Sequence, residues 1–328
     1  MAWDVFNTTS GAFTLNALTY AINQLPYKPG RIGEIGWFQE QGVATTNINI
    51  EEQTGVLSVL TVKPRGAVGT VLTGEKRNIR SFVMPHIPAI ASIMADEVQN
   101  VRAFGQETAA QSINDIQARY LQRLRESIEY ILESHRLSAV MGNYINAAGV
   151  STSLFTEFGV SQQTTALALT TSTTKLRQKV LDILTKVENA LGGVNYSKVR
   201  ILCGANVWSE FIEHEAVKGS LQYQDSAALR GDPRAAVDWG GVLWERYRGT
   251  SAVKVPDDEA YAVPEGVPGL FITRFAPADY NETVNTMGLP LYAKAEMMEF
   301  GKGIKLEAQS NPLNLCTRPA AIIKLTKT

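Results

Sequence analysis

INDIQARYLQRLRESIEYI, residues 113–131, lies within a proline-free span from residue 109 to residue 145. Its apolar side chains recur every three or four residues, at Ile113, Ile116, Tyr120, Leu124, Ile128 and Ile131. This spacing predicts a helix with one apolar face, and the whole span would reach about 55 Å at a rise of about 1.5 Å per residue. A seven-residue repeat would place Arg123 in the seam of a coiled coil. We therefore expect a long spine helix that packs on a sheet.

The chain beyond this helix alternates between helical and strand patterns. A second helix is expected from Thr174 to Leu191, because Gly192 and Gly193 follow as a stop signal. Further patterns predict strands at 199–203, 241–247 and 270–275 and a helix at 206–217. Residues 304–308 and 320–325 are expected to form a strand pair. These patterns together predict an α+β fold.

Residues 1–38 mix aromatic side chains with proline and glycine, and no helical or strand period persists there. We expect an extended arm that needs a surface to lie on. Its charged residues, Asp4, Lys28, Arg31 and Glu34, cancel one another. This balance argues against the basic arm of shells that condense nucleic acid while they assemble.

The segment after the arm combines strand and turn signals. The alternation in Asn47–Ile50, the turn signal Thr54-Gly55 and the β-rich run Val56–Val62 predict a hairpin. Lys63-Pro64-Arg65-Gly66 breaks this pattern, and the chain up to Arg80 has too few large apolar side chains for a core of its own. We expect a long projecting loop.

This loop carries a cluster of basic residues. Its members are Lys63, Arg65, Lys76, Arg77 and Arg80. With the opposing charge of Glu75, they give the loop a local charge of about +4 by formal counting. Between residues 42 and 81 there is no aromatic side chain that could stack on bases. A solvated loop and a nucleic-acid contact are the alternatives, but carboxylates of a neighbouring subunit are the favoured target. The cluster is therefore predicted to be an intersubunit contact.

The composition points toward assembly. Only 19% of the 328 residues are charged, below the roughly 25% typical of soluble domains, so much of the surface is expected to meet other protein. The net charge of −1 provides no overall attraction to phosphate backbones or anionic membranes. The N-terminus lacks a signal-peptide pattern, and two cysteines, Cys203 and Cys316, favour a reducing compartment.

The sequence contains no recognised catalytic motif. His86, His135 and His214 are far apart and have no metal-ligand spacing. Residues 69–74 superficially resemble a phosphate loop, but Glu75 occupies the position of the required lysine. We therefore predict no catalytic, cofactor-binding or metal-binding residues, and expect that the protein is not an enzyme.

Several short segments together resemble one family. They are Phe82–Pro88, Arg230–Pro233 with Gly240 and Gly241, Phe275–Pro290, Ser310–Leu313 and Thr317–Pro319. With the order of arm, loop, spine and α/β unit, they resemble the lambda-like major capsid protein E family of tailed phages, which has the Hong Kong phage capsid fold. The similarity runs over most of the chain.

The resemblance implies a division into an N-terminal arm, an extended loop, a peripheral domain with the spine helix, an axial domain, and closing strands of the peripheral domain. We place these at residues 1–38, 39–85, 86–177, 178–295 and 296–328, respectively. It implies hexamers and pentamers in an icosahedral virion shell, assembled in the host cytoplasm as a procapsid that matures around packaged double-stranded DNA.

The resemblance also implies partners: a portal, a maturation protease, a scaffold on a separate chain and, in many relatives, a decoration protein. DNA would be enclosed without sequence-specific binding. The near-zero net charge agrees with this expectation. Two alternatives stay open, an encapsulin-like nanocompartment shell of the same fold and, more remotely, an α/β hydrolase or transferase. No motif assigns a residue pair to covalent cross-linking.

Overall fold

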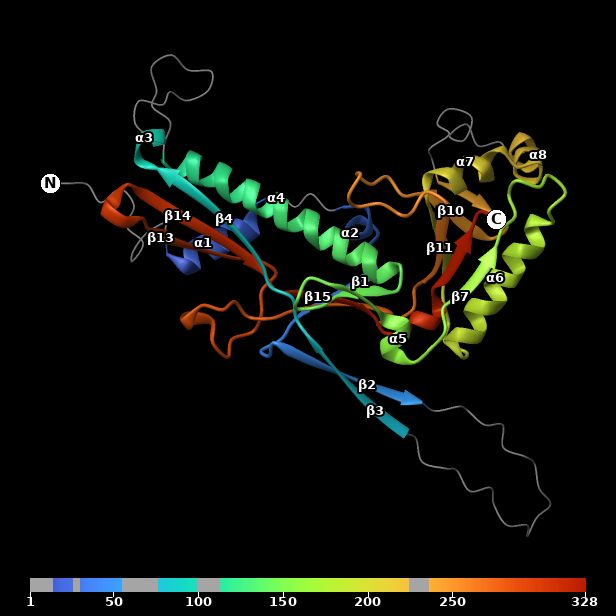
Figure 1. Cartoon of the computed structure of the whole chain (residues 1–328), viewed down its shortest axis with the longest axis horizontal. Helices are drawn as coiled ribbons and strands as arrows, with labels where there is room; N and C mark the ends of the chain where they lie inside the picture. Colours follow the sequence, from blue (N-terminus) through green and yellow to red (C-terminus); the bar gives the residue numbers. More distant parts are fainter. Residues whose placement is uncertain (1–13, 26–29, 55–75, 99–112, 224–235) are drawn as a thin grey trace, which may run out of the picture.

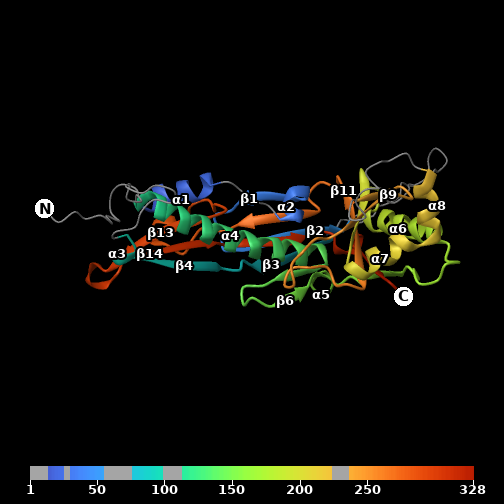
Figure 2. The ribbon, with the colours of Figure 1, turned by 90° about the horizontal axis from the view of Figure 1, so that it is seen from above.

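Three sheets follow one another along the longest axis of the molecule (Figure 1). The computed structural model describes residues 14–25, 30–54, 76–98, 113–223 and 236–328. The spine helix and its sheet lie at one end, a second sheet lies in the middle, and the largest sheet lies at the other end with three helices. Seen from above, the molecule is thin relative to its length (Figure 2). Among the described residues, no helix is long and apolar enough to span a membrane.

The spine helix, α4, runs from Ile113 to Val140. Its apolar stripe packs on a three-stranded antiparallel sheet of β13 (Tyr292–Met297), β14 (Gly303–Ser310) and β4 (Ile87–Met94). The buried contacts come mainly from Ile116, Leu121, Leu124 and Ile128, with Ile93, Ile304 and Leu306 opposite. This confirms the prediction of a spine packed on a sheet. The expected helix start, residues 109–112, lies outside the described residues.

The helix ends at Val140, before the end of the proline-free span at residue 145, because the chain turns at Gly142. Gly142 has a φ of +84°, in the left-handed region, and a Cβ there would come within 2.2 Å of the Phe155 ring. Glycine is therefore required for the chain to turn so close to Phe155. The turn leads into β5 (Asn143–Ile145), β6 (Ser151–Ser153) and the short helix α5 (Leu154–Phe158).

The N-terminal segment, residues 14–40, differs from the predicted extended arm. It forms two helices, α1 (Leu15–Gln24) and α2 (Arg31–Ile35), and their side chains Leu18, Ile22 and Ile32 are fully buried. The surface on which it lies belongs to its own subunit, because α1 packs on β13 and α4. The spacing of Leu15, Leu18 and Ile22 is helical, but aromatic, proline and glycine residues around it obscured the period.

The middle sheet joins distant parts of the chain. β1 (Phe38–Gly42) pairs in parallel with β12 (Phe271–Phe275), and β12 pairs antiparallel with β15 (Pro312–Cys316). Its core also includes Leu137 and Val140 from the end of α4. The middle sheet therefore ties the N-terminal segment to the spine and to the C-terminal strands.

The largest sheet has six strands in the order β7-β16-β11-β8-β10-β9. They are β7 (Gln163–Ala166), β16 (Ile323–Thr326), β11 (Glu259–Glu265), β8 (Lys198–Cys203), β10 (Val242–Arg246) and β9 (Val237–Trp239). The helices α6 (Leu176–Leu191), α7 (Ala205–Glu213) and α8 (Glu215–Tyr223) contribute to its core. The predicted helix at 206–217 is thus two helices, because the chain leaves the helical conformation at His214.

The expected strand pair of residues 304–308 and 320–325 is wrong. β14 lies in the spine sheet, whereas β16 lies in the six-stranded sheet between β7 and β11. Both strands have ordinary strand patterns, but pairing partners are fixed by tertiary contacts that local alternation does not encode. The boundaries drawn for the five regions remain a prediction.

A hairpin projects from the middle of the molecule (Figure 1). β2 (Asn47–Thr54) pairs antiparallel with β3 (Lys76–Val83), so that Asn47 faces Val83 and Thr54 faces Lys76. The predicted hairpin had residues 56–62 as its second strand, and those residues lie outside the described part. Residues 76–80, predicted as loop, continue the strand. One further short helix, α3 (Ala95–Val98), follows β4.

Candidate assembly surfaces

Arg80 joins the projecting hairpin to α5. Its Nε donates to the carbonyl oxygen of Glu157 at 2.6 Å and its Nη2 donates to that of Phe158 at 3.1 Å. The guanidinium carbon lies 4.8 Å from the centre of the Phe158 ring. Carbonyls in the last turn of a helix lack intrahelical partners and favour a cation. Arg80 therefore caps the C-terminal end of α5.

The neighbouring side chain on the same face of β3 strengthens this anchor. Phe82 is 2% exposed and meets Tyr144 edge-on at 5.2 Å and Phe158 in a stacked arrangement at 6.2 Å between ring centres. From β2, Ile48 and Ile50 pack against the same core. The body-facing side of the hairpin root is thus fixed by the hydrogen bonds of Arg80 and by an aromatic cluster.

The structure brings three of the predicted contact residues onto one strand. Lys76, Arg77 and Arg80 all lie in β3, and Lys76 and Arg77 are paired through the backbone register with Thr54 and Gln53. Lys63 and Arg65 lie outside the described residues. Arg80 is engaged with its own subunit, which the sequence did not indicate. An intersubunit role for this basic cluster remains a prediction.

The outward side of the hairpin root is apolar or uncharged, and sequence reasoning missed it. Ile79 is 64% exposed and Val83 is 50% exposed. Ser81 and the facing Asn47 and Asn49 are also exposed. The alternation of Ile79, Ser81 and Val83 with Arg80 and Phe82 contained the signal, because successive strand residues point to opposite faces. We call these five exposed residues the outer face of the hairpin.

A groove of about 850 Å³ adjoins this outer face. Its lining includes Asn47 and Asn49 from the hairpin, His86 after it, and Asp279 and Val284 from the loop that follows β12. His86 Nδ1 lies 2.8 Å from Asn311 Oδ1, and His86 Nε2 lies 4.0 Å from Asp279. Apart from this pair, the lining has no charged side chain among the described residues. The outer face of the hairpin and the adjoining groove therefore form one largely uncharged surface among the described residues.

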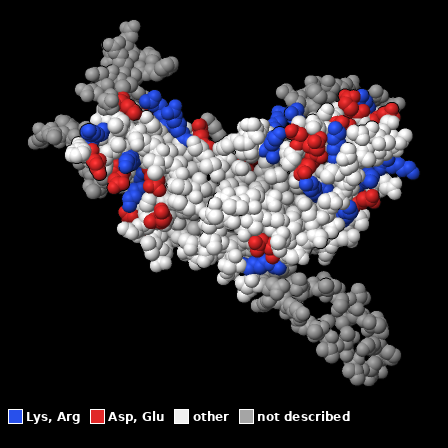
Figure 3. All heavy atoms as spheres, viewed as in Figure 1, with Lys and Arg blue, Asp and Glu red and all other residues white. Residues whose placement is uncertain are grey.

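The distribution of charge agrees with this description. On the face drawn in Figure 3, charged side chains gather over the two ends of the molecule and at the hairpin root, and the middle carries few. Several large apolar side chains are exposed as well, including Ile90 at 65% and Met287 at 60%. The middle of this face is thus poor in charge, and exposed apolar side chains occur on several elements.

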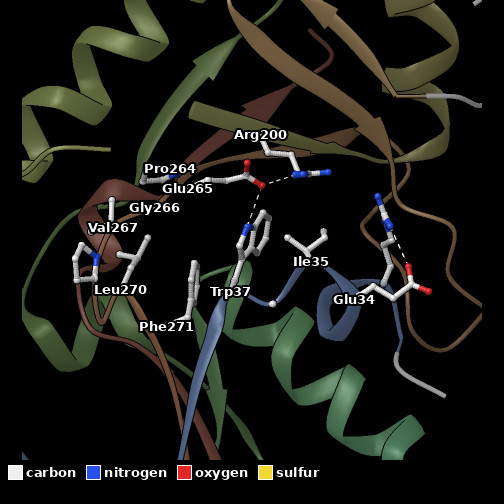
Figure 4. A pocket seen from close by; sticks show the side chains of 13 residues that line it. Glu34, Ile35, Trp37, Arg200, Pro264, Glu265, Gly266, Val267, Leu270 and Phe271 are labelled. Carbon is white, nitrogen blue, oxygen red and sulfur yellow. Dashed lines mark hydrogen bonds and ion pairs between the residues drawn. The ribbon is translucent and has the colours of Figure 1, made fainter. Parts of the chain in front are cut away.

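A second concave site lies between the N-terminal segment and the six-stranded sheet (Figure 4). This cleft of about 660 Å³ has residues 31–37 on one side and Arg200 with residues 264–271 on the other. Glu265 accepts hydrogen bonds from Trp37 Nε1 at 3.0 Å and from Arg200 Nε at 2.5 Å. The bond from Trp37 connects the two walls of the cleft, and the bond from Arg200 holds Glu265 in place.

The charged chain continues behind the cleft. Arg200 Nη1 pairs with Glu245 Oε2, and Arg31 Nε pairs with Glu245 Oε1, both at 2.5 Å. Burial alone would raise the pKa of Glu245, but hydrogen bonds and charges from Arg31 and Arg200 outweigh it and lower that pKa. Glu245 therefore stays ionised and holds two arginines from different parts of the chain.

The two cysteines and three histidines lie on different elements. Cys203 and Cys316 are buried, and burial raises the pKa of both thiols, that of Cys316 to about 12. Where the structure describes the chain, no three metal-ligating side chains gather in a metal site. His135 and His214 occupy α4 and the break between α7 and α8, far from His86 in the sequence.

Comparison with known proteins decides the family. The profile of phage major capsid protein E matches residues 14–327. The chain belongs to this family. Its relatives include the major capsid protein of Pseudomonas phage KPP10, which is 26% identical, with 95% of this chain and 96% of the relative covered. The major capsid protein of Salmonella phage Felix O1 is 21% identical, with 97% of both chains covered.

A solved structure supports the fold of this family member. The capsid of Myoviridae phage XM1 covers 100% of this chain and 98% of its own, with a TM-score of 0.54 and 12% identity. The Hong Kong phage capsid fold and the α+β class predicted from the sequence are therefore confirmed. The family match also confirms the tailed-phage resemblance and does not favour the encapsulin-like alternative.

Proposed function

We propose that the chain is the shell subunit of a tailed-phage head, and that its copies assemble into hexamers and pentamers of a closed icosahedral shell around double-stranded DNA. The observation that carries this proposal is the family match over residues 14–327, which includes the spine helix, the hairpin strands and the six-stranded sheet. The family consists of structural capsid proteins, which gives no support to a hydrolase or transferase activity.

Within the shell, the end with α4 and its sheet acts as the peripheral part, and the end with the six-stranded sheet acts as the axial part. The hairpin projects away from both and reaches a neighbouring subunit. Its outer face, Asn47, Asn49, Ile79, Ser81 and Val83, provides an uncharged contact, while Arg80 holds the hairpin at its root. Burial of exposed apolar area is the expected driving force of this contact.

The remaining partners follow from membership of the family. A separate scaffold, a portal and a maturation protease assist assembly in the host cytoplasm, and a decoration protein is a further candidate partner. The DNA would be enclosed through weak, salt-sensitive contacts without sequence preference, because the net charge of −1 provides no overall attraction to phosphate.

Electron microscopy of the purified protein tests this function. The chain would be expressed alone and together with the scaffold and protease genes that neighbour its own. Closed shells or capsomers are the expected result. A subunit that stays a monomer at high concentration, although the scaffold is present, would contradict the proposal. A substrate-turnover screen on the same sample would test the remote enzyme alternative.

A further inference from the structure

The turn between β13 and β14 lies at the opposite end of the molecule from the six-stranded sheet (Figures 1 and 2). Two backbone hydrogen bonds close this turn. The N–H of Gly301 donates to the carbonyl oxygen of Met298 at 3.0 Å, and the N–H of Met298 donates to the carbonyl oxygen of Gly303 at 2.9 Å. These bonds give the turn one defined conformation. We call residues 296–305, which comprise the turn and the adjoining strand ends, the tip.

Phe300 has an unfavourable backbone conformation within the tip. Its φ of +61° and ψ of +16° lie in the left-handed region, where glycine or asparagine is usual and a bulky side chain is disfavoured. The side chain is 92% exposed, and the centre of its ring lies 5.8 Å from the Lys302 ammonium, near the outer limit of a cation–π contact. Packing within the subunit therefore offsets little of this strain. Strained residues cluster at functional positions, which points to a role for Phe300 outside its own subunit.

Four exposed charged side chains flank Phe300. Glu296 and Glu299 lie on the β13 side of the tip, and Lys302 and Lys305 lie on the β14 side. None of the four forms an ion pair in the part of the chain that the structure describes, although Glu296 and Lys305 face each other in the strand register. The tip is therefore neutral as a whole, with unpaired acidic groups on one strand and unpaired basic groups on the other.

An identical tip provides the complement of this surface. A second copy, rotated about a symmetry axis through the tip, brings its basic side against the acidic side of the first. Glu299 of one copy then faces Lys302 of the other, and the Phe300 rings meet close to the axis, where each covers apolar surface of the other. A partner with one sign of charge, such as a nucleic acid, would instead repel half of the charged groups.

We propose that the tip is a self-complementary contact that binds the tip of a second copy of this chain. Phe300 forms its apolar centre, and the two acidic side chains of one copy pair with the two basic side chains of the other. Its place in a shell rests on the proposed function, whereas binding between two tips is a property of the full-length chain. This contact is separate from the outer face of the hairpin, which lies near the middle of the molecule (Figure 1).

Charge reversal in two separate chains tests the ion pairs. Glu299→Lys gives every tip an excess of positive charge, and Lys302→Glu gives every tip an excess of negative charge. Each folded variant alone should therefore sediment as smaller assemblies than the parent. An equal mixture of the two variants should recover the assemblies of the parent, because tips of opposite charge then meet. A role of these residues within their own subunit would not be recovered by mixing, so failure of the mixture would contradict the ion pairs.

Asp182→Lys is the matched control for charge. It makes the same change at an exposed position on α6 that forms no ion pair among the described residues. This variant should assemble like the parent, and it should not rescue Glu299→Lys when the two are mixed. An assembly defect equal to that of Glu299→Lys would show that net charge, and not the tip, controls the contact.

Phe300→Asn tests the aromatic centre. Asparagine tolerates the left-handed region, so the thermal midpoint of the subunit should equal or exceed that of the parent. Association should nevertheless weaken by about ten-fold or more, as is usual for an aromatic side chain at the centre of an interface. A lower thermal midpoint, or association equal to that of the parent, would contradict a role of Phe300 between copies.

A disulfide between copies tests the contact whether or not shells form. In Phe300→Cys the four charged side chains remain, and the two native cysteines are buried. Oxidation should therefore link this variant into covalent dimers about ten-fold faster than Leu181→Cys, a control that changes a 62% exposed residue on α6. Equal rates for the two variants would overturn the tip contact even if the parent forms shells. Fast linkage without shells from the parent would retain the contact and contradict the proposed function.

Discussion

At the scale of single residues, His135 is a half-buried titratable group on α4. Burial lowers its pKa from the ordinary value of 6.5 to about 4. Between these two pH values the unfolded chain binds a proton at His135 more readily than the folded chain does. The free energy of unfolding is therefore highest above about pH 6.5 and decreases as the pH falls toward about 4. Between about pH 6.5 and about pH 4, we expect the thermal midpoint of His135→Gln to fall less than that of the parent protein. The exposed His86→Gln is the control, and parallel curves for parent and His135→Gln would contradict the prediction.

Gly30 allows the close approach of Glu133 to the start of α2. A Cβ at position 30 would lie 2.2 Å from Glu133 Cδ and 2.4 Å from its Cγ. Gly30→Ala should therefore displace the carboxylate and lower the free energy of unfolding by about 1–3 kcal/mol. Gly219→Ala is the matched control, because no atom lies near its added methyl in α8 and alanine favours a helix. Chemical denaturation that ranks the two variants equally would exclude this explanation.

At the scale of elements, Arg80 makes the hairpin root and α5 a single unit. Arg80→Ala removes both hydrogen bonds to the α5 carbonyls, so hydrogen exchange should accelerate in residues 79–83 and 154–159 together. We expect a local loss of about 1.5–3 kcal/mol, the usual range for hydrogen bonds that involve a charged group. Arg80→Lys keeps the charge without the forked geometry and should have an intermediate effect. Acceleration in the hairpin alone would show that Arg80 does not cap α5.

The elements also show what the sequence can predict. The helices α4 and α6 were predicted because their apolar stripes persist over several turns and glycine follows each of them. α1 was missed because the aromatic, proline and glycine residues around its ten residues obscured the helical period. β3 was missed because its first residues, Lys76 to Asn78, are polar and its strand character depends on pairing with β2. The positions of Arg80 and of the Glu245 network depend on contacts between distant segments, which no local pattern encodes.

At the scale of the whole molecule, the outer face of the hairpin should control assembly. Ile79→Asp places a charge where an uncharged contact is proposed, and the side chain is exposed, so the subunit should still fold. Even about 1 kcal/mol per contact accumulates because symmetry repeats it at each subunit. Sedimentation should show free subunits. Leu181→Asp, at a similarly exposed position on α6, is the control. An equal assembly defect in Leu181→Asp would contradict the proposal that the outer face of the hairpin controls assembly.

Reversal of Arg77 and Arg80 to Glu tests the predicted basic contact, and the two positions should now behave differently. Arg77→Glu alone should impair assembly while the circular dichroism and thermal melting of the subunit match the parent. Arg80→Glu should also destabilise the hairpin root, because its carboxylate would face the carbonyl oxygens of Glu157 and Phe158. Normal shells from Arg77→Glu would eliminate an intersubunit role for that residue.

The position of β16 has a consequence for the synthesis of the protein. β16 lies inside the six-stranded sheet, between β7 and β11. In the chain, however, the other four strands of this sheet all come between β7 and β16. A ribosome must therefore release residue 326 before the six-stranded sheet can close. Until then, β7 has no partner in the sheet and one edge of β11 is open. The six-stranded sheet is therefore completed only after residues 163–326 have all been synthesised.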